Sequence, residues 1–213
     1  MKTRSKALLL TLCAVLLVAA TIFGTMAYLT STDTVTNTFT VGKVNIKLDE
    51  AKANPDGSLV ANADRVKANE YKLLPGHTYN KDPMVTVLGG SESSYVKMTV
   101  TFSMADELDA IFAPDGADML KFFNGYNATN WIAKGNTKDE TANTRTYEFW
   151  YKEAVAAPNG DVALDALFDS ITAPGEITGA QLASIKGMTI TVNAYAIQAD
   201  GFANAEAAWA AFN

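Results

Sequence analysis

One stretch of the chain, Tyr95 to Ser103, alternates apolar and polar residues without a break. Side chains of a β-strand point to opposite faces in turn, so this period of two predicts a strand with one buried and one solvent-facing side. Such strands are typical of antiparallel sheets, because strands of parallel sheets are covered on both faces. The stretch therefore directs the chain towards an antiparallel β fold. Its predicted buried face holds Val96, Met98, Val100 and Phe102.

Two later stretches predict further long strands. Thr146 to Lys152 has aromatic residues on both faces, which indicates a central strand with a neighbour on each side. Met188 to Gln198 repeats the simple alternation of the first stretch. A shorter strand is predicted at Met84 to Leu88, and another begins at Trp131. The predicted inner face of the last long strand holds Met188, Ile190, Val192, Ala194 and Ala196.

Helical spacing is confined to short segments. We predict a helical turn at Asp106 to Phe112, a helix of about ten residues at Val162 to Ile171, and a closing Ala-rich helix at Ala205 to Phe212. Trp209 and Phe212 would anchor the closing helix.

Polar segments separate these elements. Asn136 to Thr144 predicts a loop, and Asp49 to Glu70 predicts a surface excursion with a turn near Gly57. Several alternating strands joined by turns, with only short helices, predict a mainly β fold: a two-layer antiparallel β-sandwich with short helices in the connections.

The N-terminal strand of this sandwich is predicted at Thr36 to Leu48. Its apolar residues change parity at Gly42, so one extra residue must be absorbed to keep them on one face. A β-bulge at Gly42 would do this, because glycine tolerates the bulged conformation. The apolar residues on either side are Phe39 and Val41, then Val44, Ile46 and Leu48.

The first 27 residues have the pattern of an export signal. A basic start precedes an uncharged run, Ala7 to Phe23, and small residues follow at Thr25 and Ala27. Cleavage after Ala27 would leave Tyr28 as the first residue of a single domain, residues 28–213, with an N-terminal strand arm at 28–48. The alternative is that the apolar run stays uncut as a membrane anchor, although it is slightly shorter than the roughly 20 residues of a spanning helix.

Composition narrows the classes of partner. The chain has a net charge of −6, and three of its 17 basic residues but none of its 23 acidic residues lie in the predicted signal. An acidic domain disfavours binding to nucleic acid and to anionic lipid surfaces, because both are negatively charged and bind patches of Lys and Arg. The one cysteine, Cys13, also lies in the signal, so the exported domain would have no disulfide. Cys13 follows Leu12, which does not fit a lipoprotein signal.

Two motifs resemble the TasA/camelysin family of exported proteins from Gram-positive bacteria. The first joins Gly24-Thr25-Met26-Ala27 to Asn37-Thr38-Phe39-Thr40-Val41-Gly42, and the second joins Leu73-Leu74-Pro75-Gly76 to Lys81-Asp82. The resemblance implies a jelly-roll-like sandwich, cleavage by a SipW-type signal peptidase, and a location in the extracellular matrix or on the cell surface. It also implies a subunit of TasA-type biofilm fibres.

Such a subunit could assemble by β-strand addition, in which a strand of one molecule fills a sheet edge of the next. The interface would be a head-to-tail contact between copies of this chain, with a matrix accessory protein as a further partner. Equally, the strand could pair within its own subunit, or move between the two positions. The predicted interface residues are Phe39, Val41, Val44, Ile46 and Leu48.

The sequence offers little for catalysis, and we predict no enzyme, no cofactor and no metal site. A camelysin-type peptidase would need zinc ligands such as His-Glu-x-x-His, but the chain has a single histidine, His77, in a predicted turn. The acidic pairs Asp106/Glu107 and Asp139/Glu140 are typical of solvated surfaces.

Two binding alternatives remain open. Asn54, Asp56 and Asp64 could bind calcium, although the closing glutamate of an EF-hand is missing. The aromatic residues Trp131, Tyr147 and Trp150 could form a glycan platform on a monomeric surface-binding module, although packing is the commoner role of such residues.

Overall fold

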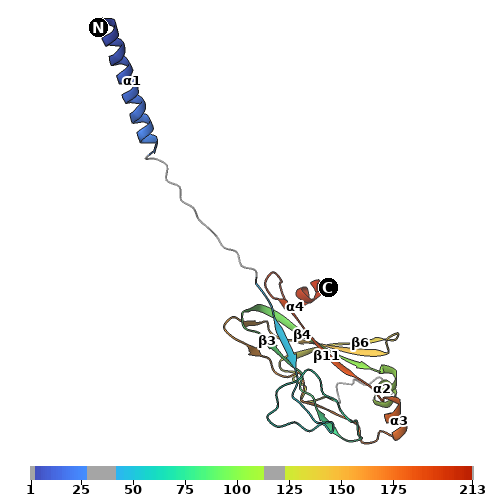
Figure 1. Cartoon of the computed structure of the whole chain (residues 1–213). Coiled ribbons are helices and arrows are strands. Elements are labelled where there is room, and N and C mark those ends of the chain that lie inside the picture. The colour runs from blue at the N-terminus through green and yellow to red at the C-terminus, as the bar shows by residue number, and fades with distance from the viewer. Residues whose placement is uncertain (1–2, 28–41, 113–122, 213) are drawn as a thin grey trace. The chain divides into compact units, whose positions relative to one another are not determined.

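The computed structural model describes residues 3–27, 42–112 and 123–212, with side chains of residues 5–18 alone in the first range. The chain divides into two compact units, Met1–Val41 and Gly42–Asn213, and each is described by itself. The first unit contains helix α1 (Thr3–Ala27), whose Leu and Ala residues favour helix (Figure 1). Within the described residues, no helix combines the length and hydropathy needed to cross a membrane.

The second unit is built on one large antiparallel sheet (Figure 1). Strand β4 (Ser91–Ser103) pairs with β11 (Ile190–Gln198) on one side and with β7 (Thr144–Tyr151) on the other. Strand β6 (Trp131–Asp139) extends the sheet beyond β7, and β8 (Val155–Ala157) pairs with the start of β4. The large sheet therefore ends in β11 at one edge and in β6 at the other.

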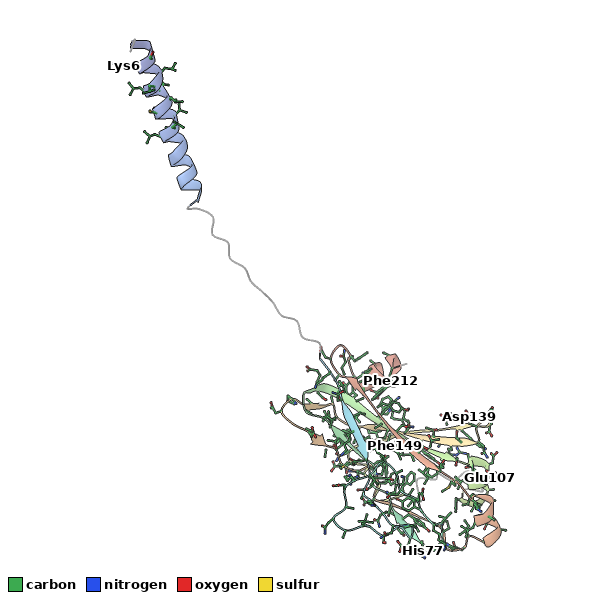
Figure 2. All side chains as sticks on the ribbon, in the orientation of Figure 1. Lys6, His77, Glu107, Asp139, Phe149 and Phe212 are labelled. Carbon is green, nitrogen blue, oxygen red and sulfur yellow. The ribbon has the colours of Figure 1, made fainter. Side chains whose placement is uncertain are left out.

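Two small antiparallel sheets complete the sandwich. One has the order β1 (Ile46–Asp49), β3 (Met84–Val87), β9 (Val162–Ala163), and the other has the order β2 (Thr78–Asn80), β10 (Ser170–Thr172), β5 (Phe123–Asn124). Side chains from the small and large sheets meet in one hydrophobic core, which includes the fully buried Val85, Val100 and Phe149 (Figure 2).

The predicted alternation of β4 is confirmed. Val96, Met98 and Val100 have no exposed surface, whereas the residues between them are partly exposed. The central position of β7 is also confirmed, since it pairs with β4 and β6. The mainly β, antiparallel fold is therefore as predicted.

The helices of the sandwich are short, as predicted. They are α2 (Ala105–Phe112), α3 (Gly179–Ser184) and α4 (Ala205–Ala211). Helix α3 begins with a capping box in which Thr178 and Gln181 bond to each other's backbone N–H groups. Trp209 anchors α4 with 7% of its surface exposed, while Phe212 is 36% exposed and packs against the Trp209 ring at 5.4 Å between centroids.

The helix predicted at Val162 to Ile171 is wrong. The segment is extended, and its backbone bonds to strands rather than to itself: Leu164 N–H donates to Val85 O and Leu167 N–H donates to Pro83 O. Leu164 and Leu167 are buried. The apolar spacing therefore predicted which residues are buried, but it predicted the wrong backbone conformation. Short apolar runs do not distinguish a helix from a buried extended segment when neighbouring strands supply the hydrogen bonds.

The loop predicted at Asn136 to Thr144 is mostly wrong. Residues 136–139 continue β6 and Thr144 starts β7, so the turn spans only the four residues between them. An edge hairpin exposed on both faces needs no apolar alternation, because backbone bonds hold it. The turn is fixed by Asp139, whose side chain accepts the backbone N–H of Thr141 and of Ala142 at 2.9 Å.

The N-terminal strand is observed only in its last part. Strand β1 begins at Ile46, and before it Lys43 O accepts the Glu92 N–H and Asn45 O accepts the Leu88 N–H, both at 2.9 Å. Residues 36–41 lie outside the described residues, and with them the parity change that predicted a bulge at Gly42.

Candidate assembly edges

The residues predicted at the signal-peptidase site lie at the end of α1. The backbone of Thr25 and Ala27 is helical, and the side chains of both, like the whole of Tyr28, lie outside the described residues. The structure therefore gives no side-chain contacts for this site.

The five residues predicted to enter a neighbouring molecule fall into two groups. Phe39 and Val41 lie outside the described residues. Val44, Ile46 and Leu48 are half-buried, and Ile46 and Leu48 pack against the core of their own sandwich. Opposite Val87 and Val85 respectively, they pair within their own chain.

The free edge of β1 is closed by the segment that follows it. Glu50 and Val66 exchange two backbone hydrogen bonds, of 2.9 and 2.8 Å, and Lys67 Nζ donates to Leu48 O. These contacts occupy the outward backbone groups at the C-terminal end of β1, so another strand has little access to that end.

A network of ion pairs binds the segment after β1 to the sandwich. Arg65 Nε lies 2.6 Å from Asp49 Oδ1, and Arg65 Nη1 lies 2.8 Å from Asp82 Oδ2, while Lys47 Nζ lies 2.6 Å from Asp49 Oδ2. Burial raises the pKa of the Asp49 carboxyl, but the hydrogen bonds from Lys47 and Arg65 outweigh it and hold the pKa below its ordinary value of 3.8. Asp49 is thus a buried anion that folding stabilises.

A second buried pair lies beside it. Lys81 Nζ is 2.6 Å from Glu50 Oε2, and both residues are less than a tenth exposed. Burial raises the pKa of the nearby Tyr71 hydroxyl, which donates to Asn80 O at 2.6 Å. The expected surface excursion at Asp49 to Glu70 is therefore tied to the sandwich by charges, and the Lys81-Asp82 motif supplies two of them. The sequence analysis missed this role, although Asp49 and Glu50 at the end of the predicted N-terminal strand were a sign of buried ion pairs.

Strand β11 has an open edge. Within the described chain it pairs only with β4, and the register is regular from Ile190 to Gln198. Odd-numbered positions bond to β4, as the bond from Ala199 N–H to Ser93 O shows at 2.8 Å. Antiparallel pairing alternates, so the even-numbered residues direct their backbone groups away from β4. This edge is formed by Val192, Ala194 and Ala196.

Side chains on the inner face of β11 are less covered than their partners. Val192, Ala194 and Ala196 are half-buried, although the β4 residues opposite them have no exposed surface. Strand β1, which belongs to a small sheet, lies close to β11. The second layer therefore covers β4 fully and β11 only in part.

Strand β6, the other long edge, differs in its charged residues and in its register. It carries Lys134 and Lys138, and its register shifts between Ala133 and Gly135. Gly135 has φ of +109°, a value that suits glycine. Lys134 Nζ lies 4.0 Å from the centroid of the Trp150 ring. The strand is thus bulged, and it carries two lysines, which pair with Glu206 and with Asp106.

The acidic residues considered for catalysis have structural partners. Asp106 and Glu140 both bind Lys138, at 2.5 and 3.2 Å. Glu107 accepts a hydrogen bond from Asn143 Nδ2 at 2.9 Å. These contacts join α2 to the β6–β7 hairpin and account for the positions of the carboxylates.

The candidate metal ligands do not converge. His77 is exposed at one end of the sandwich unit (Figure 2). Asp56 accepts hydrogen bonds from the Ser58 backbone N–H and hydroxyl, at 3.0 and 2.7 Å, and Asn54 also donates to that hydroxyl. The part of the chain that the structure describes contains no group of three or more His, Cys, Asp or Glu residues that could hold a metal.

The candidate glycan residues do not share a surface. Trp131 is fully buried and Tyr147 is 2% exposed. Trp150 points to the other face of the sheet, 6.2 Å from Trp209 between ring centroids. These rings therefore cannot form one platform for a ligand.

Comparisons of this chain with models of protein families, with curated proteins and with solved structures found no match.

Proposed function

We propose that this chain is an exported structural protein of a bacterial cell surface or extracellular matrix. Its copies assemble head to tail into fibres by β-strand addition, in which an extended segment of one molecule pairs with a sheet edge of the next. A contact of this kind propagates into a filament when the rotation between subunits does not close into a ring.

One observation carries the proposal. The large sheet ends on both sides in a nine-residue edge strand, β6 and β11. An edge strand presents a row of backbone donors and acceptors that a strand from another chain can pair with.

The donor that we propose lies upstream of Lys43. Ile46 and Leu48 pack in their own sandwich, and withdrawing them would cost the core part of its burial. Phe39 and Val41 precede the first residue of the sandwich unit, Gly42. We call residues 34–41 the arm, and we assign the interface to Phe39 and Val41 in place of the longer set predicted from sequence.

The N-terminal pattern supports export. Small residues at Thr25 and Ala27 suit a signal peptidase, and the match to the TasA/camelysin motifs favours an enzyme of the SipW type. Cleavage there frees the arm from α1, and a free arm is what a donor strand requires. We do not propose a peptidase activity.

The test is electron microscopy of protein purified from the medium of a Gram-positive host, together with sizing by gel filtration. We expect filaments whose amount increases with protein concentration. Folded monomers at every concentration would refute the proposed assembly.

A further inference from the structure

We propose that β11 is the acceptor edge, and that the strand it receives is the arm of a second copy of this chain. This inference rests on the proposed function, since it names the surface at which the proposed fibre subunits join.

The first argument is that β11 lacks the features that protect edge strands. Natural edges are blocked by lysine, proline, bulges or short length. Strand β6 carries Lys134, Lys138 and the bulge at Gly135, whereas β11 is nine residues long with no charge, no proline and an unbroken register. The two long edges of the same sheet therefore differ in whether another strand can dock.

The second argument excludes the other described edges. Strand β1 has four residues, and the segment that follows closes its C-terminal end, where Lys67 Nζ donates to Leu48 O and Val66 pairs with Glu50. Strands β9 and β5 have two residues each, and β2 and β8 have three each, so none of them could bind a strand as long as the arm.

The third argument is the room beside β11. Val192, Ala194 and Ala196 keep part of their surface exposed while their β4 partners keep none. A strand added to this edge would place every second side chain beside them, under the incompletely covered margin of the core. Alanine at two of these positions leaves space for larger side chains from the incoming strand.

The fourth argument is the sequence of the arm. From Thr34 to Val41 threonine occupies every even position, and the odd positions hold three apolar residues, Val35, Phe39 and Val41, together with Asn37. β-branched and aromatic residues favour strands. The eight residues are one fewer than the nine of β11, and they carry no charge that would oppose docking on an uncharged edge. The arm thus has an apolar face for the core and a polar face for solvent.

Disulfide capture tests the pairing directly. In a Cys13→Ala background, one chain carries a single donor cysteine on the outward face of the arm, and a second chain carries Thr191→Cys or Asn193→Cys on β11. The control acceptor is Thr137→Cys, an exposed position on β6. Two cysteines directly opposite each other on paired strands lie close enough to form a disulfide. Two cysteines displaced by two positions along the strands do not. The donor is placed in turn at Thr36→Cys, Thr38→Cys and Thr40→Cys.

The chains are mixed under assembly conditions, treated with a mild oxidant and resolved by non-reducing electrophoresis. We expect a heterodimer from at least one donor with Thr191→Cys or Asn193→Cys, at least tenfold more abundant than with Thr137→Cys. Equal or greater capture at Thr137→Cys overturns the inference, and so does the absence of β11 capture while fibres form. If the unsubstituted protein forms no fibres, the proposed function fails as well, so the two failures are distinguishable.

A matched pair of substitutions gives an independent readout. Ala194→Lys places an inward-pointing charge on β11, and Ala133→Lys adds the same charge to the edge of β6. We expect at least a tenfold loss of fibre for Ala194→Lys and less than a twofold loss for Ala133→Lys, with circular dichroism confirming that both fold. Equal fibre yields from the two folded variants would overturn the choice of β11.

Discussion

Replacing Arg65 by methionine should destabilise the sandwich by about 3 kcal/mol. The Asp49 side chain is 2% exposed, and Arg65 contacts it at 2.6 Å while also bonding to the Asp82 carboxylate at 2.8 Å. Removing one partner of a buried ion pair costs about 3–5 kcal/mol, because the other charge stays buried without compensation. We expect the lower end of that range, since Lys47 still contacts Asp49 and since Arg65 itself is 28% exposed. Urea denaturation followed by circular dichroism measures the loss.

The effect should depend on pH in one direction. The pKa of Asp49 is held below its ordinary 3.8 in the folded protein, so its stabilising contribution is complete above that value and is lost as the pH falls through the folded pKa. Arg65 is one of two groups that lower the pKa of Asp49, so the carboxyl should accept a proton more readily without it. The difference in unfolding free energy between wild type and Arg65→Met should therefore be largest near pH 7 and shrink below about pH 4.

Arg145→Met is the matched control. Arg145 pairs with Asp109, whose side chain is 28% exposed, so the loss should be about 1 kcal/mol or less. If Arg65→Met loses no more than Arg145→Met, or if its deficit is the same at pH 3 and pH 7, the buried network does not hold this segment.

Three further predictions concern processing, activity and β1. The secreted protein should begin at Tyr28 by N-terminal sequencing, and Ala27→Tyr should block cleavage because a bulky ring does not fit the small pocket of a signal peptidase. The purified protein should show no casein cleavage that a chelator removes and zinc restores, because His77 is its one histidine. Val44→Asp should destabilise the monomer in urea because Val44 is half-buried, whereas Lys43→Glu at the exposed neighbouring position should leave the unfolding midpoint unchanged. An intact N-terminus on the secreted protein would contradict the first prediction, and zinc-dependent casein cleavage would contradict the second. Equal unfolding midpoints for Val44→Asp and Lys43→Glu would contradict the third.

The long strands were predictable because their burial is one-sided. In β4 and β11 one face meets the core and the other meets water, so the sequence alternates and reveals the conformation. The turn at Gly57 was predictable for a local reason as well, since its φ of +89° favours glycine.

The errors arose where long-range contacts decide the conformation. Leu164 and Leu167 have helical spacing, yet the carbonyl groups of β3 and of Pro83 accept their backbone N–H groups and keep them extended. Asn136 to Asp139 has no apolar alternation, because an exposed hairpin edge buries nothing. The partner of the first segment is distant in sequence, whereas the second pairs with the adjacent strand β7 but leaves no apolar pattern to show it.

The candidate site was predictable on the donor side only. The alternation around Phe39 and Val41 is visible in the sequence, but the acceptor depends on the order of strands in the sheet. Met188 to Gln198 was recognised as a strand, and its lack of charge was visible beside Lys134 and Lys138 of β6. What the sequence could not show is that β11 and β6 are the two edges.

The most direct test of the central claim compares two doubly substituted arms by electron microscopy. Phe39→Asp with Val41→Asp places two charges on the face that should enter the neighbouring molecule, and Thr38→Asp with Thr40→Asp places the same charges on the opposite face. The account predicts that the first variant is a folded monomer without fibres, and that the second still forms fibres. Fibres at the wild-type level from the first variant would contradict the claim that the N-terminal arm joins the subunits.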